Sequence, residues 1–286
     1  QVAQTNTSPG PVSGGHVSAT FGTDGFLAST STVSFFKDGT FNLNDQSQTI
    51  DALTFNGGAV ALSYGSLYLN NDVTVNASAG NTADISGTAG NGVLSLTLNR
   101  AGGVDTGPDA TRTFNVVGGV GNTYDLTIGA IVQAGNFVKS GNGTLLLSNS
   151  ANTYVGSTSV TGGILNIQGG TSGSTSALGA SDGSAGQGTS VSSGGTLQLQ
   201  GGISVTTELA TLSGSGYNPG SGVLGALNNI SGNNTWGNAG NTRINLAADA
   251  RINSSAGTLT IAGNTSSSSN NALTFGGAGD ITVTGG

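Results

Sequence analysis

Two aspartates beside an arginine form the densest group of potential catalytic side chains in the sequence. Asp105 and Asp109 are four residues apart, and Arg112 follows three residues later. Grouped carboxylates with a basic neighbour can cleave polysaccharides by general acid–base chemistry. The other aspartates are dispersed, and residues 99–111 have the composition of a loop. Solvated loop charges are therefore our preferred interpretation, and a polysaccharide lyase or hydrolase is the alternative.

Two further residue types with catalytic potential each occur once in the sequence. His16 is the only histidine and Glu208 the only glutamate. A Ser-His-Asp triad would depend on His16, beside an irregular N-terminal segment, so we predict no triad. The segment Gly276–Asp280 resembles a calcium-binding solenoid turn, but its aspartate comes one position early and the segment occurs once. We therefore predict no metal and no other cofactor.

Two aromatic residues are candidates for stacking on sugars. Tyr154 ends the sequence Asn-Thr-Tyr, and Trp236 ends the sequence Asn-Thr-Trp. Exposed aromatic rings beside polar neighbours suit glycan faces. The recurrence of one Asn-Thr-aromatic pattern instead favours a corner whose ring packs over the neighbouring coil. Glycan contact through Tyr154 and Trp236 is the alternative.

Short β-strands must position these residues, because helix signals are nearly absent. A five-residue pattern recurs along the chain: a glycine, a small residue, and then two apolar residues separated by one further residue. It occurs at 65–69, 143–147, 195–199 and 257–261, with a relative at 163–167. The two apolar residues point to one face of a strand, and the glycine can take the positive φ of a sharp corner. Repeated strands and corners predict an all-β fold, a parallel β-helix or β-solenoid. Residues 243–252 repeat Arg-Ile-Asn eight residues apart, which predicts strand, turn, strand.

The composition agrees with stacked coils. Glycine accounts for 52 of the 286 residues, and charged residues for only 7%. Like charges on successive coils, about 4.8 Å apart, would repel by roughly 0.9 kcal/mol even in water. The net charge of −7 and the scattered cations argue against nucleic acid as a partner. No apolar run reaches the roughly 20 residues that span a bilayer, so no membrane insertion is predicted.

The chain is expected to form one continuous rod. Residues 1–15 read as an N-terminal arm or linker, and residues 16–286 as a continuous β-solenoid with loops near 99–111 and 171–190. Coils of roughly 22 residues would give about 13 coils.

One stretch of the sequence carries a family resemblance. The run KSGNGTLLL at 139–147, followed by NTYVGSTSVTGGIL at 152–165, resembles the autotransporter-associated β-strand repeat of bacterial surface and secreted proteins. Residues 194–199 and 231–236 fit its continuation. The likeness covers residues 40–286 loosely and residues 137–286 well. The resemblance implies a right-handed parallel β-helix, exposed at the cell surface or extracellular, without catalytic residues.

We therefore expect a non-enzymatic extracellular structural protein, serving as a surface fibre, stalk or adhesive biofilm matrix. Strand-like sequence continues to the C-terminus without a capping helix. The expected partners are further repeats of a longer chain, a second copy docked head to tail into a filament, or surface glycans. In the filament, the arm around Val2 and Val12 would add to a neighbour's strand edge near Ile281 and Val283.

Overall fold

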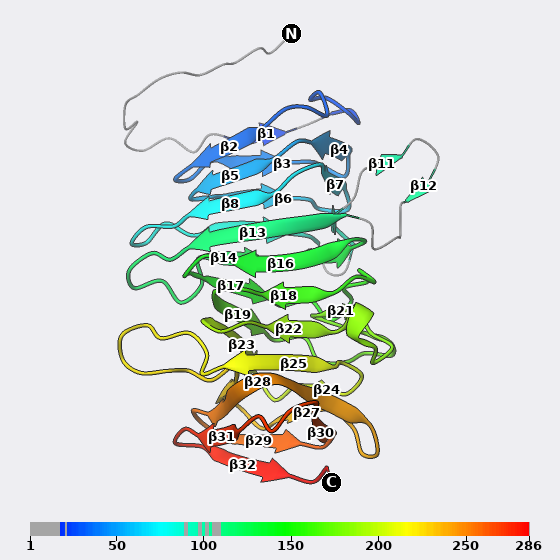
Figure 1. The fold of residues 1–286 in the computed structure, drawn as a ribbon. Coiled ribbons are helices and arrows are strands. Elements are labelled where there is room, and N and C mark those ends of the chain that lie inside the picture. The colour runs from blue at the N-terminus through cyan, green and yellow to red at the C-terminus, as the bar shows by residue number, and fades with distance from the viewer. Residues whose placement is uncertain are drawn as a thin grey trace.

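The computed structural model describes residues 18–20, 22–88, 91–96, 99–100, 103–104 and 110–285. In these residues the only helical element is a 3-10 turn, η1 (Ala185–Gln187), and no helix could cross a membrane. Figure 1 shows strands stacked along one axis, from β1 near one end to β32 at the other. The chain is the predicted right-handed parallel β-helix, a single elongated rod.

The strands form three walls, and parallel pairing joins each strand to the equivalent strand of the next coil. The first wall contains β2 (Val33–Phe36), β5 (Leu53–Asn56), β8 (Val73–Asn76), β13 (Thr111–Val117), β16 (Asn136–Ser140), β18 (Thr158–Val160), β22 (Thr189–Val191), β25 (Ala210–Gly214), β28 (Thr242–Ser254) and β30 (Asn264–Ser267). The second wall contains β1 (Ser18–Thr20), β3 (Thr40–Asn42), β6 (Gly58–Ala61), β9 (Ala83–Ser86), β14 (Leu126–Ile128), β17 (Thr144–Leu147), β19 (Gly163–Ile167), β23 (Gly195–Gln200), β26 (Leu227–Ser231), the end of β28, and β31 (Leu273–Gly276). The third wall contains β4 (Ser47–Ile50), β7 (Ser66–Leu69), β10 (Val93–Ser95) and β15 (Ile131–Gln133), then β24 (Ser204–Val205), β27 (Asn234–Trp236), β29 (Thr258–Ile261) and β32 (Asp280–Val283).

Aligned residues of the first wall give the coil length. Leu53 pairs with Val73, 20 residues later, and Lys139 pairs with Val160, 21 residues later. Other coils are longer: Val160 pairs with Val191, 31 residues later. The described part of the first wall has ten strands. This is fewer than the coil number expected from the sequence, because insertions lengthen several coils.

Columns of stacked apolar side chains fill the space between the walls. In the second wall Leu145 pairs with Leu165, and Leu165 with Leu197, and all three are fully buried. The rings of Phe114 and Phe137 stack in the same core, with their centroids 4.4 Å apart. Burying a leucine or phenylalanine side chain contributes roughly 1.5–3 kcal/mol. The core predicted from the glycine-led pattern is confirmed for this column.

The corners require particular residues. Gly163 has a φ of +62°, and a Cβ atom there would lie 2.4 Å from the Gly141 carbonyl oxygen, so only glycine fits. At residues 242–254 the predicted strand, turn and strand are one continuous strand, β28. Ile244 pairs in the first wall and Ile252 in the second, so this strand bends across a corner without breaking.

The predicted loops differ from each other. In the region 99–111, β11 (Asn99–Arg100) and β12 (Gly103–Val104) form a short antiparallel ribbon. The segment 171–190 is not an open loop but lies against the rod. It contains the antiparallel pair β20 (Thr175–Ser176) and β21 (Gly179–Ala180), and η1. Ala177 and Leu178 between these strands are fully buried and anchor the segment in the core. The expected arm, residues 1–15, lies outside the described residues.

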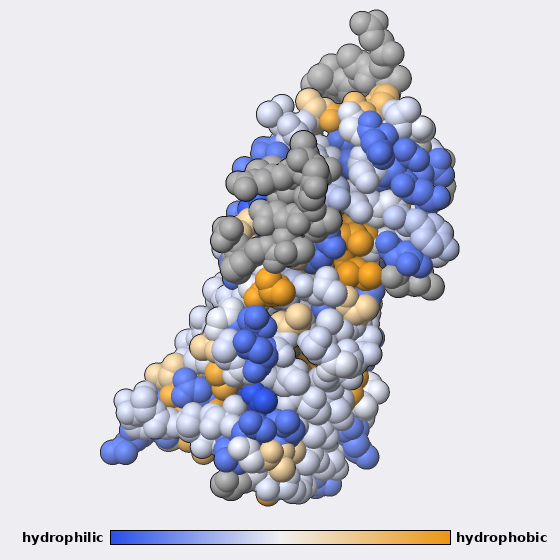
Figure 2. Space-filling view, turned by 90° about the vertical axis from the view of Figure 1, so that its right-hand side faces the viewer, coloured by the Kyte–Doolittle hydropathy of each residue, from blue (hydrophilic) through white to orange (hydrophobic). Residues whose placement is uncertain are grey.

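The outer surface is mostly polar. On the face shown in Figure 2, the coloured side chains are largely hydrophilic or intermediate, and hydrophobic side chains form small separate patches.

Candidate functional site

The two aromatic residues predicted as glycan contacts lie inside the rod. Tyr154 and Trp236 are fully buried. The Tyr154 hydroxyl shares a hydrogen bond of 2.7 Å with Thr158 Oγ1, and Trp236 Nε1 donates to the Arg243 carbonyl at 2.9 Å. Burial also raises the pKa of Tyr154. Neither ring offers a face to a sugar, because Tyr154 packs into the core from an irregular corner and Trp236 from strand β27.

The asparagines of these corners connect neighbouring coils. After β15, residues 148–157 form no strand of the third wall, and Asn152 takes the place of one. Its Oδ1 accepts from the Val132 N–H at 2.8 Å, and its Nδ2 donates to the Ala177 carbonyl at 2.8 Å. Asn234 likewise accepts from the Ile203 N–H, at 2.6 Å. The predicted corner is therefore found at residues 152–154, whereas Asn234–Trp236 form strand β27 of the third wall.

The carboxylate group expected near residue 105 cannot be assembled from the described residues. Asp105, Asp109 and His16 lie outside them. Arg112 is described, and its guanidinium is bound to the wall, because Nε donates to the Leu69 carbonyl at 2.9 Å. The polysaccharide-cleaving site therefore stays a prediction at these positions.

Glu208 is fully buried beneath the segment 171–190. Its Oε1 accepts from Thr189 Oγ1 at 2.7 Å, and its Oε2 has no hydrogen-bond partner among the described residues. Burial raises the pKa of Glu208 to about 8, against which the hydrogen bond from Thr189 acts. The carboxyl is therefore mostly protonated at neutral pH. A fully buried group cannot reach a polymeric substrate, so Glu208 is a core residue.

A lysine that the sequence analysis did not single out is buried at the corner after β16. Lys139 is fully buried, and its Nζ donates to the carbonyl oxygens of Ser140, Gly141 and Gly162 at 2.8, 3.0 and 3.1 Å. Burial lowers the pKa of Lys139 to about 7, and the charge of Asp125 opposes this shift. The ammonium group thus binds corner carbonyls of two successive coils.

Asp125 accepts hydrogen bonds from backbone N–H groups, whereas Lys139 donates hydrogen bonds to backbone carbonyl oxygens. Its Oδ1 accepts from the Gly119 N–H and its Oδ2 from the Thr144 N–H, each at 2.8 Å. Asn122 Nδ2 also donates to Oδ1, at 3.1 Å. The alternation of β16 could have placed Lys139 inside the rod, because Lys139 follows the inward-facing Phe137 by two residues and must therefore point inward.

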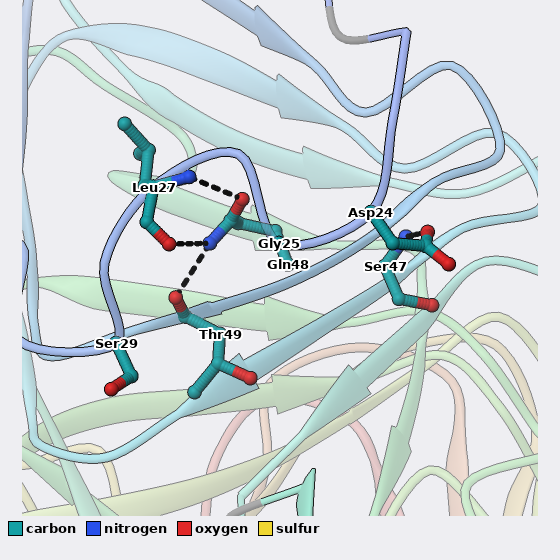
Figure 3. Close-up of a pocket in the computed structure, with 7 residues that line it drawn as sticks. All are labelled: Asp24, Gly25, Leu27, Ser29, Ser47, Gln48 and Thr49. Atoms are coloured by element: carbon teal, nitrogen blue, oxygen red, sulfur yellow. Dashed lines mark hydrogen bonds between the residues drawn. The ribbon is translucent and has the colours of Figure 1, made fainter.

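A cavity of about 420 Å³ lies where the chain covers the edge of β4. It is lined by Asp24, Gly25, Leu27, Ser29, Ser47, Gln48 and Thr49, and Figure 3 shows them. The Gln48 side chain accepts from the Leu27 N–H at 3.0 Å and donates to the Leu27 carbonyl at 2.9 Å. Asp24 Oδ1 accepts from the Ser47 N–H at 2.6 Å. These polar groups are occupied in closing the strand edge, so the cavity is part of a cap.

A second cavity, of about 340 Å³, contains two carboxylates and a lysine on the outside of the rod. Asp38, Asp84 and Lys37 line it together with several backbone segments of the second wall. Burial raises the pKa of Asp84, and a hydrogen bond with Ser86 opposes this. This is the combination of groups that a polysaccharide-cleaving enzyme would need.

No metal centre is formed by the described part of the chain, in which no three His, Cys, Asp or Glu side chains come together. The calcium-like segment Gly276–Asp280 joins β31 to β32, and Asp280 is exposed.

Of the four residues predicted to mediate self-assembly, the structure describes only the two near the C-terminal end. Ile281 and Val283 lie on β32, which pairs with β29, and Val283 is 50% exposed. Phe275 on β31 is 45% exposed, although it continues a core column. Val2 and Val12 lie outside the described residues.

The fold and the buried corners together define a β-helical repeat protein whose most constrained polar residues hold its coils together. Residues 137–167, which contain β16 to β19, match the family model described as passenger-associated-transport-repeat. A stretch of 56 residues is 46% identical to a protein named adhesin BmaC autotransporter from Brucella suis biovar 1 (strain 1330), covering 20% of this chain and 2% of that protein. No solved structure matches the chain. Residues 137–167 thus carry a passenger-associated repeat, and the chain spans only a small part of the length of the curated relative that it matches.

Proposed function

We propose that this chain is a non-enzymatic rod segment of an exported passenger, and that it serves as a stalk or adhesive part of a surface fibre or biofilm matrix. The observation that carries the proposal is the use of buried polar side chains for stacking coils. Lys139, Asp125 and Asn152 all bond to the backbone of a neighbouring coil, and the first and last lie in or beside the matched repeat. The name of the similar adhesin supports the adhesive role.

A rod of this kind holds a surface away from the cell. Ten strands of one wall, spaced about 4.8 Å apart, extend over roughly 45 Å. The low charge and mostly polar surface suit a structure that stacks and stays exposed to water.

Surface display tests the adhesive role. Residues 1–286 are fused to an outer-membrane anchor on a non-adherent bacterium, and attachment to glass and cell–cell aggregation are measured. The anchor alone, displayed in equal amount by antibody labelling, is the control. We expect attachment or aggregation above that of the anchor, and equal values at equal display would contradict the proposal.

We also propose that the exposed core-column residues of the last described coil are covered by another β-helical coil. Phe275 and Val283 continue the columns of Ile252 and Ile261. The covering coil belongs to a second copy stacked head to tail, or to further repeats of a longer chain. Sedimentation of residues 1–286 at neutral pH tests self-stacking: Val283→Asp, or removal of residues 1–12, should shift filaments to monomers. Uniform monomers before either change would refute self-stacking.

The cavity with Asp38 and Asp84 favours one competing function, cleavage of a polysaccharide. Release of reducing ends from a panel of polysaccharides distinguishes it from the structural role. We expect no release by the purified chain. Release that Asp84→Asn or Asp38→Asn abolishes would establish an enzyme at this cavity, whereas loss in Asp105→Ala or Asp109→Ala would place it in the region 99–111.

A further inference from the structure

Uncharged amide side chains form an array on the outer face of the second wall. On β19 and β23 the side chains of Leu165, Ile167, Leu197 and Leu199 point into the core, so Asn166 and Gln198 between them point to the opposite face. Asn166 pairs with Gln198 in the strand register, and Gln168 and Gln200 follow two residues further along each strand. Tyr124, from the corner before β14, reaches the same place. We call Tyr124, Asn166, Gln168, Gln198 and Gln200 the amide surface.

Hydrogen bonds within the amide surface fix the orientation of its side chains. Gln168 Nε2 donates to the Tyr124 hydroxyl at 2.9 Å, and that hydroxyl donates to Gln200 Oε1 at 2.8 Å. Asn166 Nδ2 donates to Gln200 Oε1 at 3.1 Å and to Gln198 Oε1 at 3.2 Å. Because each amide uses one end in this network, its other end is held in one direction.

The outer ends of the half-buried Gln168 and Gln200 remain available, and Gln198 is 7% exposed. Gln168 Oε1, Gln198 Nε2 and Gln200 Nε2 make no hydrogen bond to any residue that the structure describes. Asn166 is fully buried, and its Oδ1 has no partner among those residues. Asn166 therefore holds Gln198 and Gln200 in place from the buried side of the array and does not itself contact a ligand. The surface thus presents fixed donors and acceptors about 4.8 Å apart, beside a half-buried phenol ring.

These groups match the chemistry of a neutral polysaccharide. Each sugar hydroxyl can donate and accept, so neighbouring hydroxyls can bind an amide N–H and an amide oxygen together. The phenol ring of Tyr124 can contact the apolar face of a sugar ring. The amide surface has no charged member, and the net charge of −7 disfavours an acidic polymer.

We propose that the amide surface binds a neutral polysaccharide chain laid across β19 and β23. The proposal deepens the adhesive function and rests on it, because it names the class of molecule to which the rod adheres. The glycan would contact Tyr124, Gln168 and Gln200, which are half-buried, in place of the fully buried Tyr154 and Trp236.

Native-gel retardation of residues 1–286 in dextran, galactomannan or laminarin tests the proposal, with alginate and polygalacturonate as acidic comparisons. Gln198→Glu and Gln200→Glu keep the inner Oε1 acceptor and replace only the outer N–H donor by a carboxylate oxygen. Gln187→Glu adds the same charge at η1 and keeps the acceptor that binds the Asp182 N–H, so it is the matched control.

We expect retardation by at least one neutral polysaccharide, weakened about tenfold or more by either amide-surface substitution and unchanged in Gln187→Glu. The thermal midpoint of Gln200→Glu should stay within the range of the control, whereas Gln198→Glu buries a carboxylate and should melt at a lower temperature. Retardation by none of the neutral polymers, stronger retardation by the acidic ones, or equal retardation in all variants would overturn the proposal.

Surface display of Gln200→Glu separates this proposal from the adhesive function. Loss of polysaccharide binding with full attachment to glass would leave adhesion standing and assign it to another surface. Polysaccharide binding without attachment or aggregation would support the amide surface and contradict the adhesive function.

Discussion

Replacing Lys139 by methionine should remove a pH dependence of stability that the buried ammonium group creates. The pKa of Lys139 is about 7 in the folded chain, against an ordinary value of 10.5. Between these pH values the unfolded chain holds a proton that the folded chain has released, so the free energy of unfolding rises with pH. The slope is about 1.4 kcal/mol per pH unit, which gives about 3 kcal/mol between pH 7 and 9.5. Lys139→Met has no such slope.

Urea unfolding at pH 7, 8 and 9.5 measures this difference. The fluorescence of Trp236, the only tryptophan and a fully buried one, reports the unfolding of the core. Lys37→Met, at an exposed lysine, is the matched control and should keep the slope of the unmodified chain. Equal slopes in the unmodified chain and in Lys139→Met would refute the reasoning, because the three carbonyl oxygens and Asp125 would then keep the ammonium charged at pH 9.5.

The other predictions concern the corners and the buried acid. Glu208 holds a proton when folded up to about pH 8, so the free energy of unfolding should fall as pH rises from 4.5 to 8. Glu208→Gln should lack this fall and melt at a higher temperature than the unmodified chain at pH 9; identical melting at pH 5 and pH 9 in both proteins would contradict it. Asn152→Ala leaves a buried N–H and a buried carbonyl unpaired and should cost about 2–5 kcal/mol in urea unfolding. Gly163→Ala places a Cβ atom against Gly141 at a positive φ and should cost more than about 1 kcal/mol; an unchanged midpoint would show that this corner can relax.

The strands and their stacking could be predicted because a β-helix repeats one short pattern. The glycine-led segments at 143–147 and 195–199 became β17 and β23, and their leucines share one core column as expected. The assignment of strands to three walls could not be predicted, because similar segments serve different walls. Residues 65–69 form β7 of the third wall, although they have the same pattern.

Composition predicts the wrong environment where a few buried apolar residues decide the local structure. The segment 171–190 is rich in glycine and serine, yet Ala177 and Leu178 anchor it in the core. Tyr154 and Trp236 had polar neighbours along the chain, but their surroundings in space are apolar.

The buried cluster and the amide surface depend on partners that are distant in sequence. Tyr124 and Gln200 are 76 residues apart, and the distance between them is set by three intervening coils of unequal length. A single sequence offers no means to pair them. Lys139 could have been placed inside by its strand alternation, but not its three carbonyl partners.

The unequal length of the coils has a consequence for how such a protein changes over time. The coil from Val160 to Val191 has ten more residues than the coil before it, yet both enter the first wall in the same register. The additional residues lie in the segment 171–190, whose Ala177 and Leu178 add to the core, while the columns of the first and second walls keep their register. A gene encoding this rod can therefore gain or lose such segments one coil at a time. New segments on the surface come under selection, while the stacked walls beneath them are inherited.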